Sequence, residues 1–284
     1  RVGRMPSVLI TGAARGIGRA AALRLATIGW DVHAGVRTEV DGAGLAAAAP
    51  PGRISPVLLD VTDGAQLAAL DDALGEHLDA VVNNAGVALS APVEAVGLDD
   101  LRRQLEVNVV GPVAVTQAVL PRLRASRGRV IFVSSVSGRV SSPLLGPYAA
   151  SKYALEALAD SLRIELRPWD VKVSLIEPGS VDTDIWRNAL ETADEAEAQL
   201  SDAHRALYGG HIAGMRGTIK RIQKQTAPVE KVVDAIEKAL TSPKPRARYV
   251  VGTDARVQLV LNTALPTPAM DAAVAKLTGT PGSP

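Results

Sequence analysis

Short runs of β-branched and aliphatic residues alternate along this chain with longer stretches of helical periodicity. The short runs cover residues 8–11, 32–36, 54–59, 80–82, 130–134, 171–176 and 249–251. Several are apolar throughout, as expected for parallel strands covered on both faces. The helical stretches lie between them, at 17–28, 65–74, 98–123, 148–166 and 229–240. This alternation predicts an α/β fold, a doubly wound parallel sheet of about seven strands with helices on both faces.

Two segments depart from this alternation. Residues 181–227 carry an acidic patch around Glu195 and then a basic patch around Lys220, with weak apolar periodicity. Such charge runs are most often solvated helix faces. Residues 253–284 contain an uncharged run at 257–270, which is too short to cross a membrane and is expected to pack over the pocket or against a partner. No repeat or low-complexity linker divides the chain, so we expect one domain over residues 1–284.

The composition is that of a globular protein and excludes several function classes. Of the 284 residues, 47% are hydrophobic and 21% are charged. The net charge of +1 creates no field that would favour nucleic acid or an anionic membrane. The chain has no cysteine, and its four histidines show no metal-ligand spacing. Since we find neither a secretory signal nor a membrane-spanning run, we expect a cytoplasmic protein without a metal.

The first strand runs directly into a glycine-rich turn that opens an Ala-rich helix. Gly12, Gly16 and Gly18 stand in this turn, with Arg15 and Ile17 among them. Glycines allow a tight turn and let a pyrophosphate approach the backbone N–H groups at a helix N-terminus, whose dipole favours an anion. The glycine spacing alone is a weak signal, but its position between a strand and a helix favours a dinucleotide site.

The end of the second strand bears on which dinucleotide is bound. A site for NAD usually places an acid there to hold the ribose 2′-OH. Here Val36 stands at the expected position, followed by Arg37, while Arg15 lies in the glycine turn. Two guanidiniums could clamp a 2′-phosphate. We therefore expect NADP(H) to be preferred, with NAD(H) as the alternative that Glu39 would favour.

Tyr148 and Lys152 lie four residues apart at the start of a predicted helix and so share one helix face. A cation beside Tyr148 would lower its pKa and make it a usable general acid or base. Ser134 and Ser135 end an apolar strand, where parallel strands open onto a ligand crevice. A hydroxyl there can bind a substrate oxygen, although serines also simply terminate strands.

Asn108 places an amide on the apolar stripe of the predicted helix 98–123, in line with Leu101, Leu105 and Pro112. A buried amide must be hydrogen-bonded. Asn108 is therefore either a structural bridge or part of a polar relay.

These motifs, in this order, resemble those of the short-chain dehydrogenase/reductase family over nearly the whole chain. The shared elements are the turn from Thr11 to Gly18, Asp60 after the third strand, Asn83-Asn84-Ala85-Gly86, Asn108, Ser135, Tyr148-Ala149-Ala150-Ser151-Lys152 and Pro178-Gly179. The resemblance implies a single Rossmann-fold domain that transfers a hydride between a nicotinamide and a carbonyl or alcohol carbon.

The resemblance also implies a role for each matching residue. Tyr148 would exchange the proton with the substrate oxygen, and Ser135 would hold that oxygen. Lys152 would bind the nicotinamide ribose and lower the pKa of Tyr148, and Asn108 would anchor a water that relays protons to Lys152. The remaining positions would bind the cofactor: Gly12, Arg15, Gly16, Ile17, Gly18, Arg37, Asp60, Val61, Asn84, Ala85, Gly86, Pro178, Gly179, Val181 and Thr183.

The resemblance further assigns residues 181–227 to the substrate-binding loop and helices and residues 253–284 to a C-terminal extension. It points to members that act on steroids, retinoids or other lipophilic alcohols, ketones and aldehydes. Apolar side chains of the loop could line such a pocket, or could equally belong to the core or to a subunit interface: Trp186, Leu190, Leu207, Tyr208, Ile212 and Met215. Family members usually pair through the helices predicted at 98–123 and 148–166, so we expect a homodimer or homotetramer.

The competing interpretation is a non-catalytic dinucleotide-binding sensor or scaffold protein. Such a protein need not keep the catalytic side chains, whereas Asn108, Ser135, Tyr148 and Lys152 are all present. A nucleic-acid function through residues 216–224 has less support, because that basic patch has no interleaved aromatic residues.

Overall fold

The computed structural model describes residues 5–183 and 189–282. Within them, seven strands form one parallel sheet in the order β3-β2-β1-β4-β5-β6-β7, which confirms the predicted doubly wound fold. Because the order reverses between β1 and β4, a ligand crevice is expected at their carboxyl ends. The strands are β1 (Ser7–Ile10), β2 (Asp31–Val36), β3 (Ile54–Leu58), β4 (Ala80–Asn83), β5 (Arg129–Val133), β6 (Lys172–Pro178) and β7 (Arg248–Val251).

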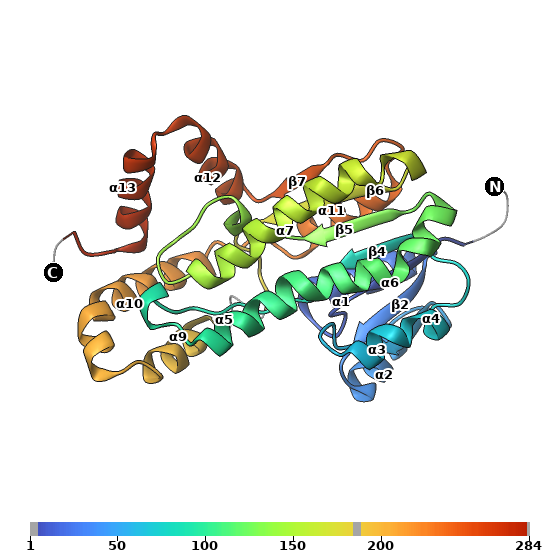
Figure 1. Cartoon of the computed structure of the whole chain (residues 1–284), viewed down its shortest axis with the longest axis horizontal. Helices are drawn as coiled ribbons and strands as arrows, with labels where there is room; N and C mark the ends of the chain where they lie inside the picture. The colour runs from blue at the N-terminus through green and yellow to red at the C-terminus, as the bar shows by residue number, and fades with distance from the viewer. Residues whose placement is uncertain (1–4, 184–188, 283–284) are drawn as a thin grey trace.

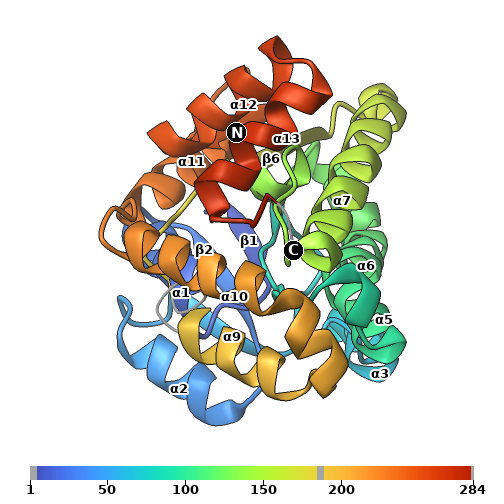
Figure 2. The same cartoon turned by 90° about the vertical axis from the view of Figure 1, so that its left-hand side faces the viewer.

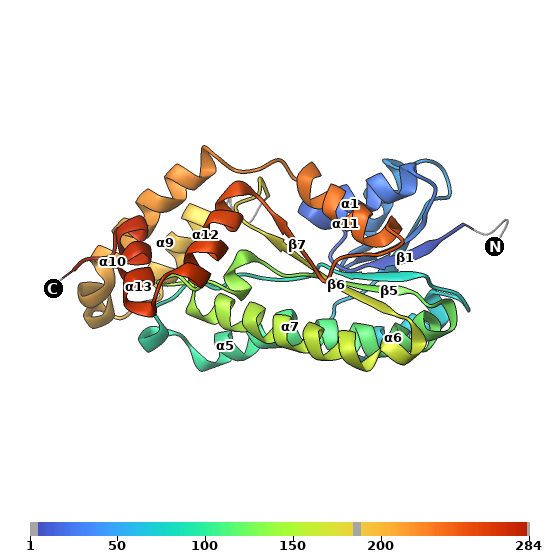
Figure 3. The same ribbon diagram turned by 90° about the horizontal axis from the view of Figure 1, so that it is seen from above.

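Helices cover both faces of the sheet, as Figure 3 shows from above. One face is covered by α1 (Gly16–Thr27), α2 (Glu39–Ala47) and α11 (Glu230–Thr241). The opposite face is covered by α5 (Leu98–Leu105), α6 (Gly111–Ser126) and α7 (Gly146–Glu165). The short helices α3 (Gly64–Ala68) and α4 (Leu70–Ala73) pack against α6.

The alternation of side chains along each strand builds a separate core on each face. In β1, Val8 and Ile10 join the core under α1 and α11, whereas Leu9 joins the core under α6 and α7. In β4, Val82 joins the core under α1 and α11, and Val81 joins the core under α6 and α7. Both sets are fully buried, which explains why these strands are apolar throughout.

The helix predicted at 98–123 is interrupted. A π turn, Glu106–Val110, separates α5 from α6 and contains Asn108. Pro112 follows it, and a proline has no N–H to donate to the carbonyl four residues earlier, which is that of Asn108. The predicted helix 65–74 is also divided, into α3 and α4.

The remaining helices gather at the end of the molecule toward which the strands point (Figures 1 and 2). They are α9 (Ala189–Ala198), α10 (Asp202–Gln223), α12 (Thr253–Ala264) and α13 (Thr267–Thr278). Elsewhere in the described residues lie short 3-10 turns at Val93–Ala95, Val136–Gly138 and Arg167–Trp169. The acidic and basic patches lie on α9 and α10, where Arg216 pairs with Asp194 and Glu197. Among the described residues, no helix is long and apolar enough to span a membrane.

Candidate active site

The glycine turn after β1 is held in a conformation that side chains would not permit. Gly12 and Gly16 have positive φ values of 64° and 55°, which favour glycine. A Cβ on Gly18 would lie 2.5 Å from Asn84 Nδ2. Gly12 and Gly18 are therefore required by the close packing of this turn at the end of β4, and Gly16 is required by its positive φ.

Asn84 and Thr11 fix the turn from both sides. Asn84 Nδ2 donates to the carbonyls of Thr11 (3.0 Å) and Gly12 (3.1 Å). Thr11 Oγ1 in turn accepts the backbone N–H groups of Asn84 and Ala85, each at 3.0 Å. Thr11 belongs to the sequence motif but was not expected to have a role of its own, and this bonding assigns it one.

The start of α1 fits a dinucleotide pyrophosphate. Arg15 stands at the N-cap position and makes no side-chain hydrogen bond to the helix, so N–H groups of the first turn are open to an anion. Gly16 faces Thr183 across this point, since a Cβ on Gly16 would lie 4.0 Å from Thr183. The turn and the predicted carboxamide-binding Thr183 are thus brought together, as a bound dinucleotide requires.

The residues expected to bind the ribose and the adenine differ in how their side chains are placed. Arg15 and Arg37 are exposed, and neither forms an ion pair in the part of the chain that the structure describes, which leaves both guanidiniums available. Asp60 accepts hydrogen bonds from Thr62, chiefly its backbone N–H, and these lower the pKa of Asp60. The side chain of Val61 is buried against Gly111, so any adenine contact of Val61 is left to its backbone.

Tyr148, Ser135 and Lys152 meet at the carboxyl end of β5. Ser135 is near enough to Tyr148 to act on its pKa, and Lys152 Nζ lies 5.7 Å from the centre of the Tyr148 ring. Lys152 is buried, and its Nζ donates to the carbonyl of Val133 at 2.9 Å. The neighbouring Ser134 is buried, and its Oγ lies beside Gly138, near Glu156.

Burial decides the direction of both pKa shifts in this group. It raises the pKa of Tyr148, and the Ser135 hydroxyl opposes that rise. It lowers the pKa of Lys152 to about 8, against the Glu156 carboxylate, which raises it. The expected net lowering of the Tyr148 pKa is therefore not found in this structure. A buried phenol that keeps its proton is suited to act as a general acid.

Asn108 serves as a bridge through its side chain. Its Nδ2 donates to Val87 O (2.9 Å) and Ser151 Oγ (3.0 Å), and its Oδ1 accepts Val87 N (2.9 Å). Ser151 Oγ donates to the Tyr148 carbonyl, so the bridge ties the π turn to the catalytic helix. Gln104, one helical turn earlier, makes the same kind of contacts with Val87 and Leu89. Sequence reasoning missed Gln104, although the spacing of the two amides was available as a signal.

The predicted carboxamide loop is clamped by the C-terminal extension. Gly179 N–H donates to Val251 O (2.9 Å), and Ser180 N–H donates to Asp254 Oδ2 (2.7 Å). A Cβ on Gly179 would lie 2.5 Å from both carboxylate oxygens of Asp254. Sequence reasoning missed Asp254, since an acid in the first turn of a helix is common and did not reveal its partner.

The segment predicted to bind substrate contributes to an apolar cluster with a small cavity. Leu144, Ile212 and Met215 are buried there and line the cavity, with Leu190 and Tyr208 packed against the cluster. Four of the six predicted lining residues thus lie in or against this cluster. Leu207 does not, since it is 64% exposed, and Trp186 lies outside the described residues.

The C-terminal extension packs against the catalytic side of the molecule. Leu259 and Met270 form a buried cluster with Val136 and Val140, which follow Ser135 in the chain. The described part of the chain contains no group of three or more histidine or acidic side chains that could hold a metal ion.

Comparisons with known proteins agree with this geometry. The model of the short chain dehydrogenase family matches residues 6–194. The chain is 36% identical to NADPH-dependent 3-dehydrocapnine reductase of Ornithobacterium rhinotracheale, over 87% of this chain and 88% of that protein. It is 37% identical to retinol dehydrogenase 5 of Mus musculus, over 93% and 86%. A short-chain dehydrogenase from Burkholderia cenocepacia J2315, solved in complex with NADP, superposes with a TM-score of 0.73 at 25% identity, over 95% and 98%.

Proposed function

The chain belongs to the short-chain dehydrogenase family, and we propose that it is an NADP(H)-dependent reductase of lipophilic ketones or aldehydes, with Tyr148 as its proton donor. The observation that carries the proposal is the convergence of Tyr148, Ser135 and Lys152 at the carboxyl end of β5. Retinol dehydrogenase 5 and the NADPH-dependent reductase are the relatives whose names support the cofactor and the substrate class.

The chain's own residues divide the chemistry among them. A bound nicotinamide would supply the hydride. Ser135 would hold the carbonyl oxygen, and Tyr148 would donate the proton that this oxygen takes up. Lys152, which lies beside the Tyr148 ring, would hold the nicotinamide ribose. Because the side chain of Asn108 is engaged with Val87 and Ser151, we assign the proton relay to its backbone carbonyl, which Pro112 cannot engage.

The cofactor would lie along the carboxyl ends of β1, β2 and β4. We assign the pyrophosphate to the turn from Gly12 to Gly18 and the nicotinamide to the loop from Pro178 to Thr183. Arg15 and Arg37 are exposed and would hold a 2′-phosphate. Arg37→Ala is expected to weaken NADPH binding about tenfold or more and NADH binding far less. Arg127→Ala, an equal change of charge at the other end of the sheet, serves as the control in the same titration.

We assign substrate binding to residues 181–227 and pocket closure to residues 253–284. The buried cluster around Leu144, Ile212 and Met215 supports a lipophilic substrate. A homo-oligomer that pairs through α7 is supported by its exposed apolar side chains Leu158 and Ile164. Light scattering after gel filtration measures the mass in solution. The cytoplasmic location stays a prediction.

The test of the proposed function is the absorbance of the reduced cofactor with NADPH and with NADH over a panel of lipophilic ketones and aldehydes. We expect turnover with NADPH by the wild type and by Tyr153→Phe, and none by Tyr148→Phe. Tyr153 lies on the same helix but is exposed, so it controls for the loss of a hydroxyl. NADPH binding without turnover across the panel would favour the sensor or scaffold interpretation instead.

A further inference from the structure

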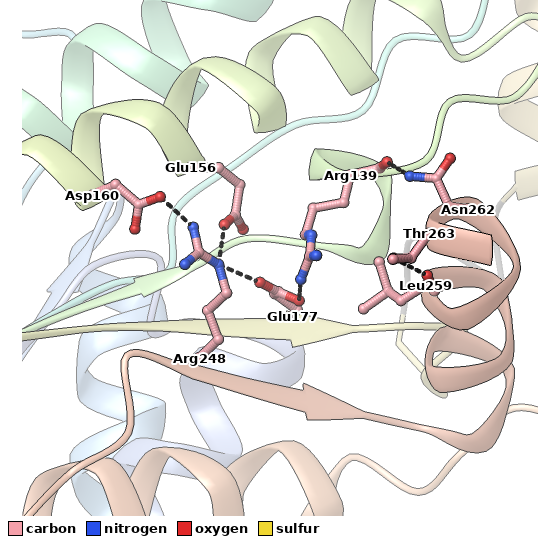
Figure 4. A network of polar contacts seen from close by, with 8 residues as sticks. All are labelled: Arg139, Glu156, Asp160, Glu177, Arg248, Leu259, Asn262 and Thr263. Atoms are coloured by element: carbon pink, nitrogen blue, oxygen red, sulfur yellow. Dashed lines mark hydrogen bonds and ion pairs between the residues drawn. The ribbon is translucent and has the colours of Figure 1, made fainter. Parts of the chain in front are cut away.

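A cluster of charged side chains near Lys152 runs from the interior to the surface, and the proposed mechanism gives it no role. Figure 4 shows it among α7, β6, β7 and the segment that follows Ser135. It combines three acids with two guanidiniums: Glu156, Asp160, Glu177, Arg139 and Arg248.

Arg248 stands at the centre of the cluster. Its Nε lies 3.0 Å from Glu156 Oε2 and 3.0 Å from Glu177 Oε1, and its Nη2 lies 2.7 Å from Asp160 Oδ2. The single N–H at Nε is directed to Glu156. Glu177 therefore shares the charge of Arg248 without receiving a hydrogen bond from it.

Glu177 is a buried acid without a hydrogen-bond donor. Its side chain is 0% exposed, and neither of its oxygens has a hydrogen-bond partner among the described residues. Arg139 is 3.6 Å away, too far for a hydrogen bond. A buried carboxylate in this condition is costly. A proton on Glu177 removes that cost, because the acid then donates to the neighbouring Glu156.

The surroundings of Glu177 also favour its protonated form. Arg163 and Arg248 both bind Asp160, so the case for a proton rests on Glu177, whose buried oxygens lack hydrogen-bond donors in the described part of the chain. Burial, and then the Glu156 carboxylate, raise the pKa of Glu177 to about 7, against Arg139 and Arg248, which lower it. Asp160 is more exposed than Glu177. Its pKa is lowered because Arg248 and Arg163 bind it.

The pair is connected to the catalytic lysine through Glu156. Glu156 follows Lys152 by one turn on α7, and its negative charge raises the pKa of that lysine. Gly138 makes room for this arrangement, since a Cβ there would lie 2.9 Å from Glu156 Cγ and 2.9 Å from Ser134 Oγ.

We propose that Glu156 and Glu177 are positioning residues for Lys152, and that they share one proton at neutral pH so that a single carboxylate charge, on Glu156, faces the lysine. The proposal rests on the catalytic role proposed for Lys152. The other charged groups that face the pair are Arg139, Arg248 of β7 and Asp160 of α7. Asn262 of α12 donates to the Arg139 carbonyl and adds no charge. Above neutrality the pair becomes doubly negative, and Lys152 retains its proton more strongly.

The shared proton is tested by thermal unfolding of Glu177→Gln between pH 5.5 and 8.5. An acid with a raised pKa binds its proton more tightly in the folded state, so wild-type stability falls as the pH rises through about 7. Glutamine cannot ionise, so the Tm of the variant relative to wild type should increase over this range. A pH-independent difference, or one that falls with pH, would overturn the shared proton. Asp160→Asn is the matched control, for which no increase is expected.

The effect on Lys152 is tested by the pH profile of kcat/KM. Glu156→Gln should move the limb due to Lys152 to lower pH by about one unit, and Glu156→Asp, which keeps the charge, should restore most of the shift. A Glu156→Gln profile that superposes on the wild type would overturn the positioning role. The unfolding experiment does not depend on enzyme activity. It therefore still tests the shared proton of Glu156 and Glu177 if Tyr148→Phe remains active and the proposed function is wrong.

Discussion

The two sides of Tyr148 are built by different kinds of contact. On the cofactor side, Gly12 and Gly18 let the turn approach Asn84 and Ala85 too closely for a Cβ, and side-chain hydrogen bonds of Thr11 and Asn84 hold it there. On the substrate side, α9 and α10 meet through apolar packing and surface ion pairs. The first kind of contact tolerates few substitutions and leaves a short sequence signature. The second tolerates many, so it can differ between enzymes that share one cofactor site.

The largest effect is expected at the cofactor side. A Cβ at Gly18 would lie 2.5 Å from Asn84 Nδ2, so Gly18→Ala must displace the turn. Such overpacking costs about 1–3 kcal/mol, equivalent to a roughly 5- to 150-fold weaker binding of NADPH. Fluorescence titration with NADPH measures it.

Gly44 provides the matched control, since it also lies in a helix and has nothing within 4 Å of its missing Cβ. Gly44→Ala should leave NADPH binding unchanged and raise the stability by up to about 1 kcal/mol. Equal NADPH affinities in Gly18→Ala and Gly44→Ala would contradict the strict packing of the turn.

The next effect is expected where the C-terminal extension holds the cofactor loop. Asp254→Ala removes the acceptor for the Ser180 N–H. A hydrogen bond to a charged group contributes about 1.5–3 kcal/mol, so kcat/KM should fall roughly tenfold. Asp254→Asn keeps an acceptor oxygen and should retain more activity. Asp271→Ala, an exposed acid on α13, should match the wild type. Steady-state kinetics that do not separate the three variants would show that Asp254 has no positioning role.

A smaller effect is expected at the apolar cluster. Met215→Ala enlarges the cavity lined by Leu144 and Ile212, so the ratio of kcat/KM between a bulky and a small ketone should rise about three- to tenfold. Leu207→Ala should leave this ratio unchanged, because Leu207 is exposed. NADPH affinity should stay constant in both variants. A ratio that shifts equally in both would place the substrate elsewhere.

The smallest effect is expected in the pH dependence of folding stability, through Lys152, which lies beside Tyr148 between the two sides. Burial lowers the pKa of Lys152 to about 8, below the value of about 10.4 in an unfolded chain. Between these two pKa values the unfolded state binds more protons than the folded state. The stability of the wild type therefore rises as the pH increases above 8. Lys152→Met is expected to be inactive. Its Tm relative to wild type should be highest below pH 8, and this difference should shrink by pH 9.5. A constant difference would contradict the lowered pKa.

The sequence predicted the sheet because each strand is a short apolar run flanked by a turn. It also predicted which residues meet at Tyr148, since the motif carries them. Helix α2 was missed because Gly42 and Gly44 weaken its helical pattern. The break at Asn108 was missed because the apolar stripe continues through the π turn.

The contacts that depend on distant segments were not predictable from pattern. Asp254 and Ser180 are separated by 74 positions, and the cluster of Glu156, Glu177 and Arg248 joins a helix to two strands. Each of these residues alone resembles an ordinary surface charge. Only the fold shows that Glu177 is fully buried.

The most direct test of the account is the transfer of deuterium from 4-deuterated NADPH to a ketone at matched cofactor occupancy, by the wild type and by Tyr148→Phe. The account predicts labelled alcohol from the wild type and, from a variant that still binds NADPH, a rate lower by about 10²–10⁴. Labelled alcohol formed by Tyr148→Phe at the wild-type rate would contradict the role of Tyr148 as proton donor.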